Sequence, residues 1–207
     1  MTERLVPLSR LSDRIKIEPY YYKMGLNGTY NECYVRSEIA TQLLKVVTFL
    51  PEGIGVHVWD GWRSFDTQLA IYEATKKELM LKGFQGVSLE RELTKYVAKP
   101  TKDIDHPSPH LSGGAVDLTL FDGNGPLPMG SEFDEFHERS QLDYFEGKKT
   151  LTSLENIYLA NRKLLKRTML NAGFISNIDE WWHYEYGTKS WANKVGAKKY
   201  FKGILEI

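Results

Sequence analysis

Hydrophobic residues recur along the chain with two different periods, and each period predicts a different kind of element. Apolar positions three to four residues apart predict helices over residues 37–50, 64–82, 89–98 and 152–172. Alternation of apolar and polar positions, or a short apolar run that ends at a turn, predicts strands over residues 55–59, 114–120 and 181–186. The segment Asp122-Gly-Asn-Gly-Pro126 predicts a turn or hairpin tip directly after the second strand.

The order of these elements predicts an α+β fold, in which helices pack around a small antiparallel sheet. The longest predicted helix, 152–172, carries an apolar face that we expect to point inward, and Leu154, Ile157, Leu165 and Met169 belong to it. A chain of 207 residues is long enough for one full core and short for two. With no internal repeat and no linker-like segment, the sequence predicts a single domain over residues 1–207.

Charge and cysteine content exclude several classes of function. Lys and Arg total 27, as do Asp and Glu, so a net charge of zero provides no general attraction to nucleic acid or to acidic membranes. Cys33 is the only cysteine, which excludes an internal disulfide and predicts a small buried hydrophobe. The first residues lack the apolar run of a signal peptide, so the chain as written is expected in the cytoplasm, or in the periplasm if a leader was removed. The oligomeric state does not follow from the sequence.

Two separated segments contain the residues that point to chemistry. Ser108-Pro-His110-Leu-Ser-Gly-Gly-Ala-Val-Asp117 provides an imidazole and a carboxylate, and Glu180-Trp-Trp-His183 provides a second imidazole and a further carboxylate. Two histidines and one aspartate are suitable ligands for one zinc ion, and three protein ligands leave a fourth position for water. The pattern therefore predicts one catalytic zinc per chain, held by His110, Asp117 and His183.

Glu180 precedes the last of these ligands by three residues. In a regular strand, positions three apart face opposite ways, so Glu180 has to lie in a bend before the strand if both side chains address one ion. The adjacent Trp181 and Trp182 can exclude water and thereby raise the pKa of the carboxyl group toward the range of a base at neutral pH. Glu180 is accordingly expected to take a proton from the attacking water.

These segments also carry a family resemblance. The pattern Ser-x-His-x-x-Gly-x-Ala-x-Asp followed by Glu-x-x-His resembles the zinc D,D-peptidases, which include D-alanyl-D-alanine dipeptidases and carboxypeptidases. Three stretches resemble the dipeptidase branch of the vancomycin-resistance type, between about Val56 and Tyr186: Trp59-Asp-Gly-Trp-Arg63, Pro128-Met-Gly-Ser-Glu-Phe-Asp134 with Glu138-Arg-Ser140, and Glu180-Trp-Trp-His183. The first fifty residues match only loosely, and the tail after Tyr186 hardly matches.

The resemblance implies further site residues. Arg63 matches the arginine that stabilises the oxyanion in this family, and Asp134 matches the partner of the substrate ammonium. Tyr20 is a match for an assisting aromatic hydroxyl, although Tyr20, Tyr21 and Tyr22 leave the register open. Ser108 either binds the substrate carboxylate or caps its own loop.

The best interpretation is zinc-dependent hydrolysis of the free dipeptide D-Ala-D-Ala. One alternative is a D,D- or L,D-carboxypeptidase that acts on peptidoglycan stem peptides and needs an open cleft. The other is a non-catalytic, zinc-containing module that binds peptidoglycan, against which the presence of Glu180 argues. The remaining histidines, His57, His106 and His137, are expected to lie outside the metal site.

Overall fold

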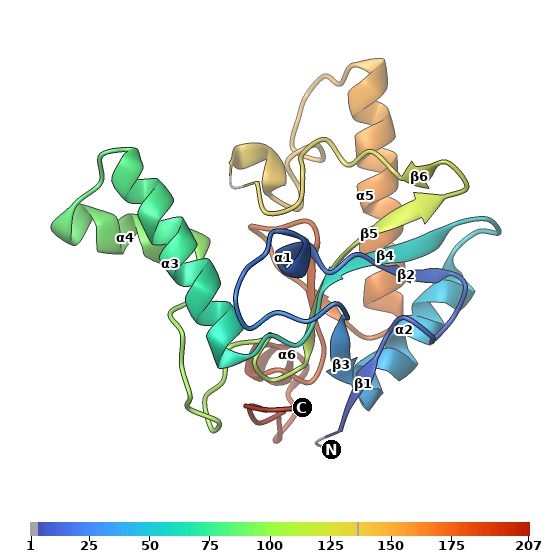
Figure 1. Cartoon of the computed structure of the whole chain (residues 1–207). Helices are drawn as coiled ribbons and strands as arrows, with labels where there is room; N and C mark the ends of the chain where they lie inside the picture. The colour runs from blue at the N-terminus through green and yellow to red at the C-terminus, as the bar shows by residue number, and fades with distance from the viewer. Residues whose placement is uncertain (1–3, 136) are drawn as a thin grey trace.

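The computed structural model describes residues 4–135 and 137–207 (Figure 1). Its helices are α1 (Tyr20–Lys23), α2 (Ser37–Phe49), α3 (Phe65–Leu81), α4 (Gly86–Tyr96), α5 (Ser153–Asn171) and α6 (Lys189–Val195), with one 3₁₀ turn at Glu138–Ser140. Its strands are β1 (Leu5–Pro7), β2 (Ile15–Ile17), β3 (Tyr34–Arg36), β4 (Gly55–Asp60), β5 (Ala115–Asp122), β6 (Gly125–Pro126), β7 (Ile175–Ser176) and β8 (His183–Glu185).

The main sheet has the strand order β2-β4-β5-β8-β7, and β6 folds back onto the end of β5. The pairs β4–β5, β5–β8 and β7–β8 are antiparallel, whereas β2 joins the edge of β4 in parallel. A separate antiparallel pair links β1 and β3. The predicted α+β class is confirmed, and the parallel edge strand is the one departure from a purely antiparallel sheet.

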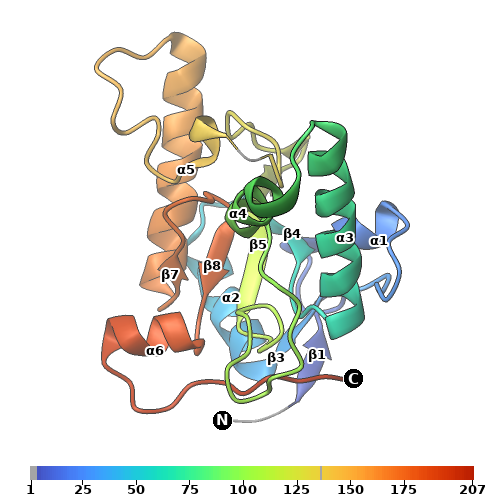
Figure 2. The same cartoon turned by 90° about the vertical axis from the view of Figure 1, so that its left-hand side faces the viewer.

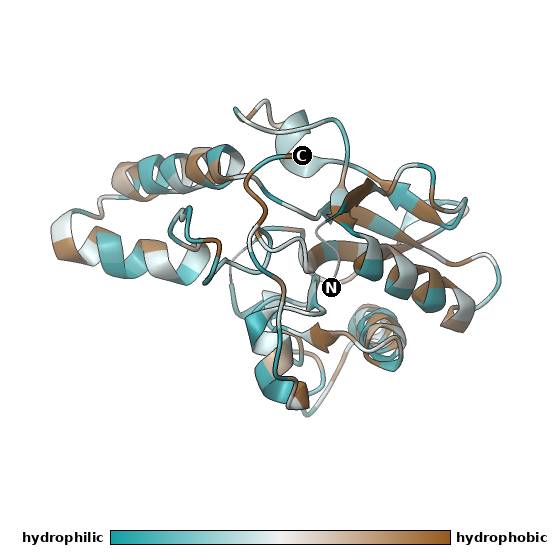
Figure 3. Ribbon diagram, turned by 90° about the horizontal axis from the view of Figure 1, so that it is seen from below, coloured by the Kyte–Doolittle hydropathy of each residue, from teal (hydrophilic) through white to brown (hydrophobic). Residues whose placement is uncertain are grey.

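Helices lie on both sides of the main sheet (Figures 1 and 2). Helices α2 and α5 contact each other, and α5 also contacts β5 and β7. Helices α3 and α4 contact each other and form a hairpin that extends away from the sheet (Figure 1). Brown and teal segments alternate along the helices in Figure 3, as expected for helices with one apolar and one polar face.

Capping residues explain where the two long helices begin. The Ser64 hydroxyl accepts a hydrogen bond from the Thr67 N–H at 3.1 Å and starts α3. At α5, Thr152 and Glu155 form a reciprocal capping box. This helix ends where Gly173 adopts a φ of 90°, a conformation that glycine reaches without steric cost.

Several local expectations were wrong or incomplete. Leu154 and Ile157 are about half exposed, because the first turns of α5 extend beyond the edge of the core. Helix α4 begins three residues earlier than predicted, since Gln85 and Ser88 form its capping box. The short strands β1, β2 and β3 and the helix α6 were not predicted, because elements of three to seven residues carry little periodic signal.

The core fills the space between the sheet and helices α2 and α5. Val116, Leu118 and Leu120 of β5 are fully buried, together with Leu43 of α2 and Leu165 of α5. Cys33 is buried among apolar residues, as predicted. Within the residues that the structure describes, no helix has both the length and the apolar character needed to cross a bilayer.

Candidate active site

Three neighbouring strands place acidic and imidazole groups side by side. Asp117 on β5 pairs with Asp60 of β4 on one side and with His183 of β8 on the other. A register irregularity in β4 between Val58 and Asp60 accompanies the first pairing. Residues 66 positions apart in the chain therefore become direct neighbours in the sheet.

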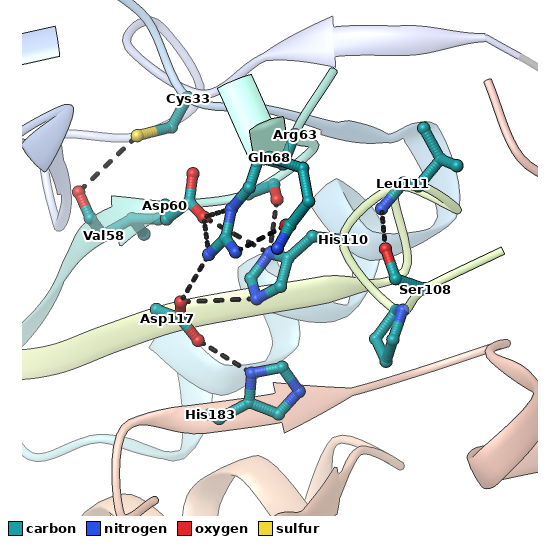
Figure 4. Close-up of polar contacts among 12 residues, drawn as sticks. Cys33, Val58, Asp60, Arg63, Gln68, Ser108, His110, Leu111, Asp117 and His183 are labelled. Atoms are coloured by element: carbon teal, nitrogen blue, oxygen red, sulfur yellow. Dashed lines mark hydrogen bonds and ion pairs between the residues drawn. The ribbon is translucent and has the colours of Figure 1, made fainter. Parts of the chain in front are cut away.

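The side chains of His110, Asp117 and His183 converge on one point (Figure 4). The His183 Nδ1 lies 2.9 Å from Asp117 Oδ1, and the His110 Nε2 lies 3.3 Å from Asp117 Oδ2. One ligand atom from each residue lies within 4.8 Å of the other two. Ligands of a tetrahedral zinc ion lie about 3.3 Å apart, given metal–ligand distances of about 2.0–2.1 Å. The donor set therefore fits a small divalent ion with little rearrangement.

The second nitrogen of each imidazole has its own partner. The His110 Nδ1 lies 2.7 Å from the Gly61 carbonyl oxygen, and the His183 Nε2 lies 3.3 Å from Glu185 Oε1. The Thr188 hydroxyl donates to the other oxygen of Glu185 and also caps α6. Partners of this kind select the tautomer and leave the opposite nitrogen, Nε2 of His110 and Nδ1 of His183, available to a metal.

The charges of the site favour a bound cation. Burial lowers the pKa of His110, so the ring is neutral and able to ligate. Burial acts to raise the pKa of Asp117, but His110 and His183 outweigh it and hold the carboxylate ionised. Burial also acts against a charged His183, yet hydrogen bonds to Asp117 and Glu185 raise its pKa well above the usual value. The carboxylates of Asp117 and Glu185 thus favour a positive charge at this position.

Arg63 is fixed beside this group. Its Nε and Nη2 donate to Asp60 Oδ2 at 2.8 and 2.6 Å, and its Nη1 donates to Gln68 Oε1 at 2.9 Å. The Nη2 also lies 3.7 Å from Asp117 Oδ2, which places the guanidinium next to the metal position (Figure 4). Burial acts to lower the pKa of Arg63, but Asp60 and Tyr21 reverse the effect, and the group is cationic.

Glu180 lies in the turn before β8, as the sequence predicted. The His183 N–H donates to the Glu180 carbonyl across this turn, and Glu180 Oε2 lies 3.8 Å from His183 Nδ1. Asn177 Nδ2 donates to the same carboxylate oxygen at 3.0 Å and holds the side chain. Burial raises the pKa of Glu180, and shifts of this kind are frequent among carboxyl groups at functional sites.

A pocket of about 210 Å³ joins these groups to Asp134. Asp134 follows the buried Phe133 and adopts a φ of 60°, which is uncommon outside glycine but tolerated by aspartate and asparagine. Burial raises its pKa to about 6, although Arg63 and a hydrogen bond from Tyr21 act in the opposite direction. A larger cavity of about 500 Å³ lies beyond Trp59 and Phe133 and contains none of the metal-site residues.

The tyrosine that faces this pocket is Tyr21 and not Tyr20. Tyr21 is buried, lines the pocket, and lies 5.0 Å from the Arg63 guanidinium carbon. The Tyr20 ring instead packs edge-on against Phe133 and lines a different hollow. Successive residues of a helix point about 100° apart, so Tyr20 and Tyr21 face different surroundings. Ser108 lines the same pocket, and its hydroxyl accepts from the Leu111 N–H at 3.3 Å.

The supporting residues that were not found by reading the sequence are Asp60, Gln68, Asn177, Glu185 and Thr188. Asp60 and Glu185 stand beside recognised motif residues, so motif adjacency could have drawn attention to them. Gln68 lies on α3 and carries no local signal, because its amide joins the Arg63 guanidinium to the distant Ala98 carbonyl. The other histidines lie elsewhere, as expected: His57 pairs with Glu18, while His106 and His137 are exposed.

Comparisons with known proteins identify the family of this chain. The sequence model of the D-Ala-D-Ala dipeptidase family matches residues 1–201. The chain belongs to this family. It is 32% identical over 149 residues to a D-alanyl-D-alanine dipeptidase of Synechocystis, and the match covers 65% of this chain and 60% of that protein. It is 30% identical over 169 residues to a D-alanyl-D-alanine dipeptidase of Enterococcus faecium, with coverage of 76% and 71%.

The fold has a counterpart among solved structures. The LdcB LD-carboxypeptidase superposes with a TM-score of 0.50 at 21% identity, over 92% of this chain and 71% of that one. At this identity the likeness concerns the fold alone. Family membership confirms the resemblance that the motifs indicated, and the matched region spans less than two thirds of the Synechocystis relative.

Proposed function

We propose that this protein is a zinc-dependent dipeptidase that hydrolyses D-Ala-D-Ala. The observation that carries the proposal is the buried group of His110, Asp117 and His183, with Glu180 and Arg63 on its rim. Membership of the D-Ala-D-Ala dipeptidase family supports the choice of substrate. A zinc ion at this group would supply Lewis acidity and lower the pKa of a water molecule beside it.

Glu180 is the proposed proton carrier. Its carboxylate lies within reach of the metal position, and its raised pKa brings proton uptake closer to neutral pH. It takes the proton of the attacking water and passes it to the departing amine as the peptide bond breaks. The hydrogen bond from Asn177 keeps the carboxylate aimed at the pocket during both transfers.

Arg63 is the proposed stabiliser of the oxyanion. Asp60 and Gln68 hold three of its N–H groups, so the guanidinium is oriented before substrate arrives. A preorganised cation of this kind stabilises the charge that develops on the carbonyl oxygen without reorganisation during the reaction. Its position 3.7 Å from Asp117 Oδ2 supports this role.

Asp134 is the proposed partner of the substrate ammonium, with Tyr21 replacing Tyr20 as the assisting hydroxyl. The support is that both residues line the pocket opposite the metal group and are hydrogen-bonded to each other. A pocket of about 210 Å³ suits a dipeptide of two small residues better than a longer stem peptide. Ser108 stands on the same wall and is the proposed contact for the substrate carboxylate.

The test combines metal content with substrate choice. We expect one zinc per chain by elemental analysis after mild purification, and hydrolysis of D-Ala-D-Ala far faster than of L-Ala-L-Ala or a D-Ala-D-Ala-terminated tripeptide. Hydrolysis of the tripeptide at the rate of the dipeptide would replace the proposal with a carboxypeptidase. Bound zinc without any hydrolysis would point to a binding module.

A further inference from the structure

Arg162 on α5 is a buried cation whose partners all lie in one loop. Its guanidinium donates to the carbonyl oxygens of Met129 at 2.7 Å, Gln141 at 2.8 Å and Arg139 at 2.7 Å, and to the Ser131 hydroxyl at 3.3 Å. An arginine has five N–H groups, and four of them are used here. Only 3% of the residue is exposed.

The ring contacts of Arg162 fix the plane of its guanidinium. The guanidinium carbon lies 4.8 Å from the Phe145 ring and 5.3 Å from the Trp181 ring. Within the described part of the chain, no carboxylate lies at ion-pair distance from it. Burial lowers the pKa of Arg162 to about 10, which leaves it charged at neutral pH. A buried cation held by neutral carbonyls is costly, so its role has to be sought in the loop it organises.

That loop, residues 129–141, carries Asp134 into the pocket. Asp134 has a φ of 60°, and the described residues of this loop, 129–135 and 137–141, form no strand and only one 3₁₀ turn. The loop makes a few hydrogen bonds of its own, such as those from the Glu132 N–H to the Glu135 carboxylate and from the Ser140 N–H to the His137 carbonyl, but the uncommon backbone conformation at Asp134 also needs support from surrounding residues. Arg162 provides this support on both sides of Asp134, at Met129 and Ser131 before it and at Arg139 and Gln141 after it.

The same contacts join the loop to the segment that holds Glu180. The Ser131 hydroxyl also accepts from Trp181 Nε1 at 2.8 Å, and the Trp181 N–H donates to the Ser140 carbonyl at 2.9 Å. Trp181 directly follows Glu180 in the chain. Arg162 and Ser131 therefore link the loop that carries Asp134 to the segment that carries Glu180.

We propose that Arg162 is a positioning residue that determines recognition of the substrate ammonium, because it holds the loop that presents Asp134. The inference rests on the proposed function, in which Asp134 binds a free amino terminus. Arg162 touches no reacting group and acts through Asp134. A lysine at position 162 keeps the charge but has three N–H donors on a single nitrogen in place of a planar fork, so it cannot bond all four of the separated acceptors.

The experiment measures kcat and KM of the zinc-loaded Arg162→Lys variant with D-Ala-D-Ala. We expect KM to rise about tenfold, because the loss of one hydrogen bond to a charged group corresponds to a change of about that size. The change in kcat should be smaller, and the zinc content should stay the same. The matched control is Arg14→Lys. Arg14 bonds the carbonyls of Leu50, Pro51 and Ile54, in a loop that lines no part of the pocket, so its KM should remain at the wild-type value.

A double-mutant cycle separates positioning from a general loss of stability. If Arg162 acts through Asp134, Arg162→Lys should change kcat/KM far less in an Asp134→Asn background than in the wild type. If Arg162 has a structural role alone, the two substitutions should act independently, and their fold-changes in kcat/KM should multiply in the double variant. Multiplied effects, or a KM for Arg162→Lys equal to that of Arg14→Lys, would overturn the inference.

Ser131→Ala decides the question if Arg162→Lys does not fold. This milder variant removes one acceptor shared by Arg162 and Trp181. We expect KM for the free dipeptide to rise about threefold, which corresponds to the loss of one weak hydrogen bond. A wild-type KM for Ser131→Ala would then reject the inference. Absence of dipeptide hydrolysis by the wild-type enzyme would instead reject the proposed function.

Discussion

Asp117 and His183 face each other directly across β5 and β8, with Asp117 Oδ1 2.9 Å from His183 Nδ1. Cross-strand neighbours in an antiparallel pair keep a nearly fixed separation, so the sheet itself sets the distance between these two predicted ligands. His110 reaches the same point from the loop before β5, where its Nδ1 contacts the Gly61 carbonyl. The candidate metal-binding group of His110, Asp117 and His183 is therefore largely preformed.

The first prediction concerns the support of His183 by Glu185. Changing Glu185 to Gln replaces a carboxylate with a neutral amide that no longer suits both His183 and the Thr188 hydroxyl. Loss of such a partner typically weakens metal binding about 10–100-fold, and we expect that range in chelator competition. Glu78→Gln, on the exposed face of α3, is the control. Equal zinc affinity in both variants would show that Glu185 does not support the metal.

The second prediction concerns Glu180. Glu180→Gln keeps a hydrogen bond with Asn177 possible but cannot accept a proton, so zinc should remain bound while turnover is lost. General-base groups contribute roughly 10²–10⁴-fold, and kcat should fall by at least that order. Asp179→Asn changes the adjacent exposed carboxylate and should leave kcat unaltered. A Glu180→Gln enzyme with more than about a tenth of normal kcat would remove Glu180 from the mechanism.

The third prediction concerns the free amino terminus of the substrate. Acetylation removes the charge that Asp134 is proposed to bind, and losing one member of a buried charged pair costs about 3–5 kcal/mol, or on the order of 10²–10⁴-fold in kcat/KM. Asp134→Asn should reduce the ratio of kcat/KM for the free dipeptide to kcat/KM for the acetylated one. Asparagine tolerates the φ of 60° at this position, so the loop should keep its conformation. Glu132→Gln, two residues earlier and exposed, serves as the control. Equal kcat/KM for the free and acetylated dipeptides would favour a carboxypeptidase.

The fourth prediction concerns pH. Burial raises the pKa of Asp134 to about 6, so below this pH the carboxyl group becomes protonated and loses its charge. The substrate ammonium stays protonated throughout this range, and its binding should weaken as the pH falls. We expect KM for D-Ala-D-Ala to rise below about pH 6, by up to tenfold per pH unit. The measurement is KM between pH 5 and 8, and a rise of the same size in Asp134→Asn would assign it to another group.

The fifth prediction concerns the core beneath the metal group. Leu118 is fully buried on β5, next to Asp117, and Leu118→Ala should lower the free energy of unfolding by about 2–5 kcal/mol. Leu154→Ala, at an exposed position of α5, should change it by less than about 0.5 kcal/mol. Denaturant unfolding of the metal-free protein measures both. Equal losses in the two variants would contradict the burial pattern.

Long periodic segments and linear motifs were readable from the sequence alone. Helices α2, α3 and α5 and strands β4 and β5 were predicted close to their observed bounds, because each repeats an apolar pattern over several turns or residues. His110, Asp117 and His183, which converge in the structure, and the nearby Glu180 were singled out because motif spacing is a local property. The bend at Glu180 followed from strand geometry, since two residues three apart cannot face one ion from a straight strand.

Tertiary structure alone decided which side chains support that chemistry. Nothing local distinguishes Tyr21 from Tyr20, and the choice came from the direction in which α1 packs toward Arg63. Arg162 and Gln68 contact backbone carbonyls at least 21 and 30 residues away. Every residue type has a backbone carbonyl, so the sequence does not reveal which one will act as the acceptor. Local pattern is enough to specify elements and motifs, whereas the contacts that orient a site depend on how those elements meet in space.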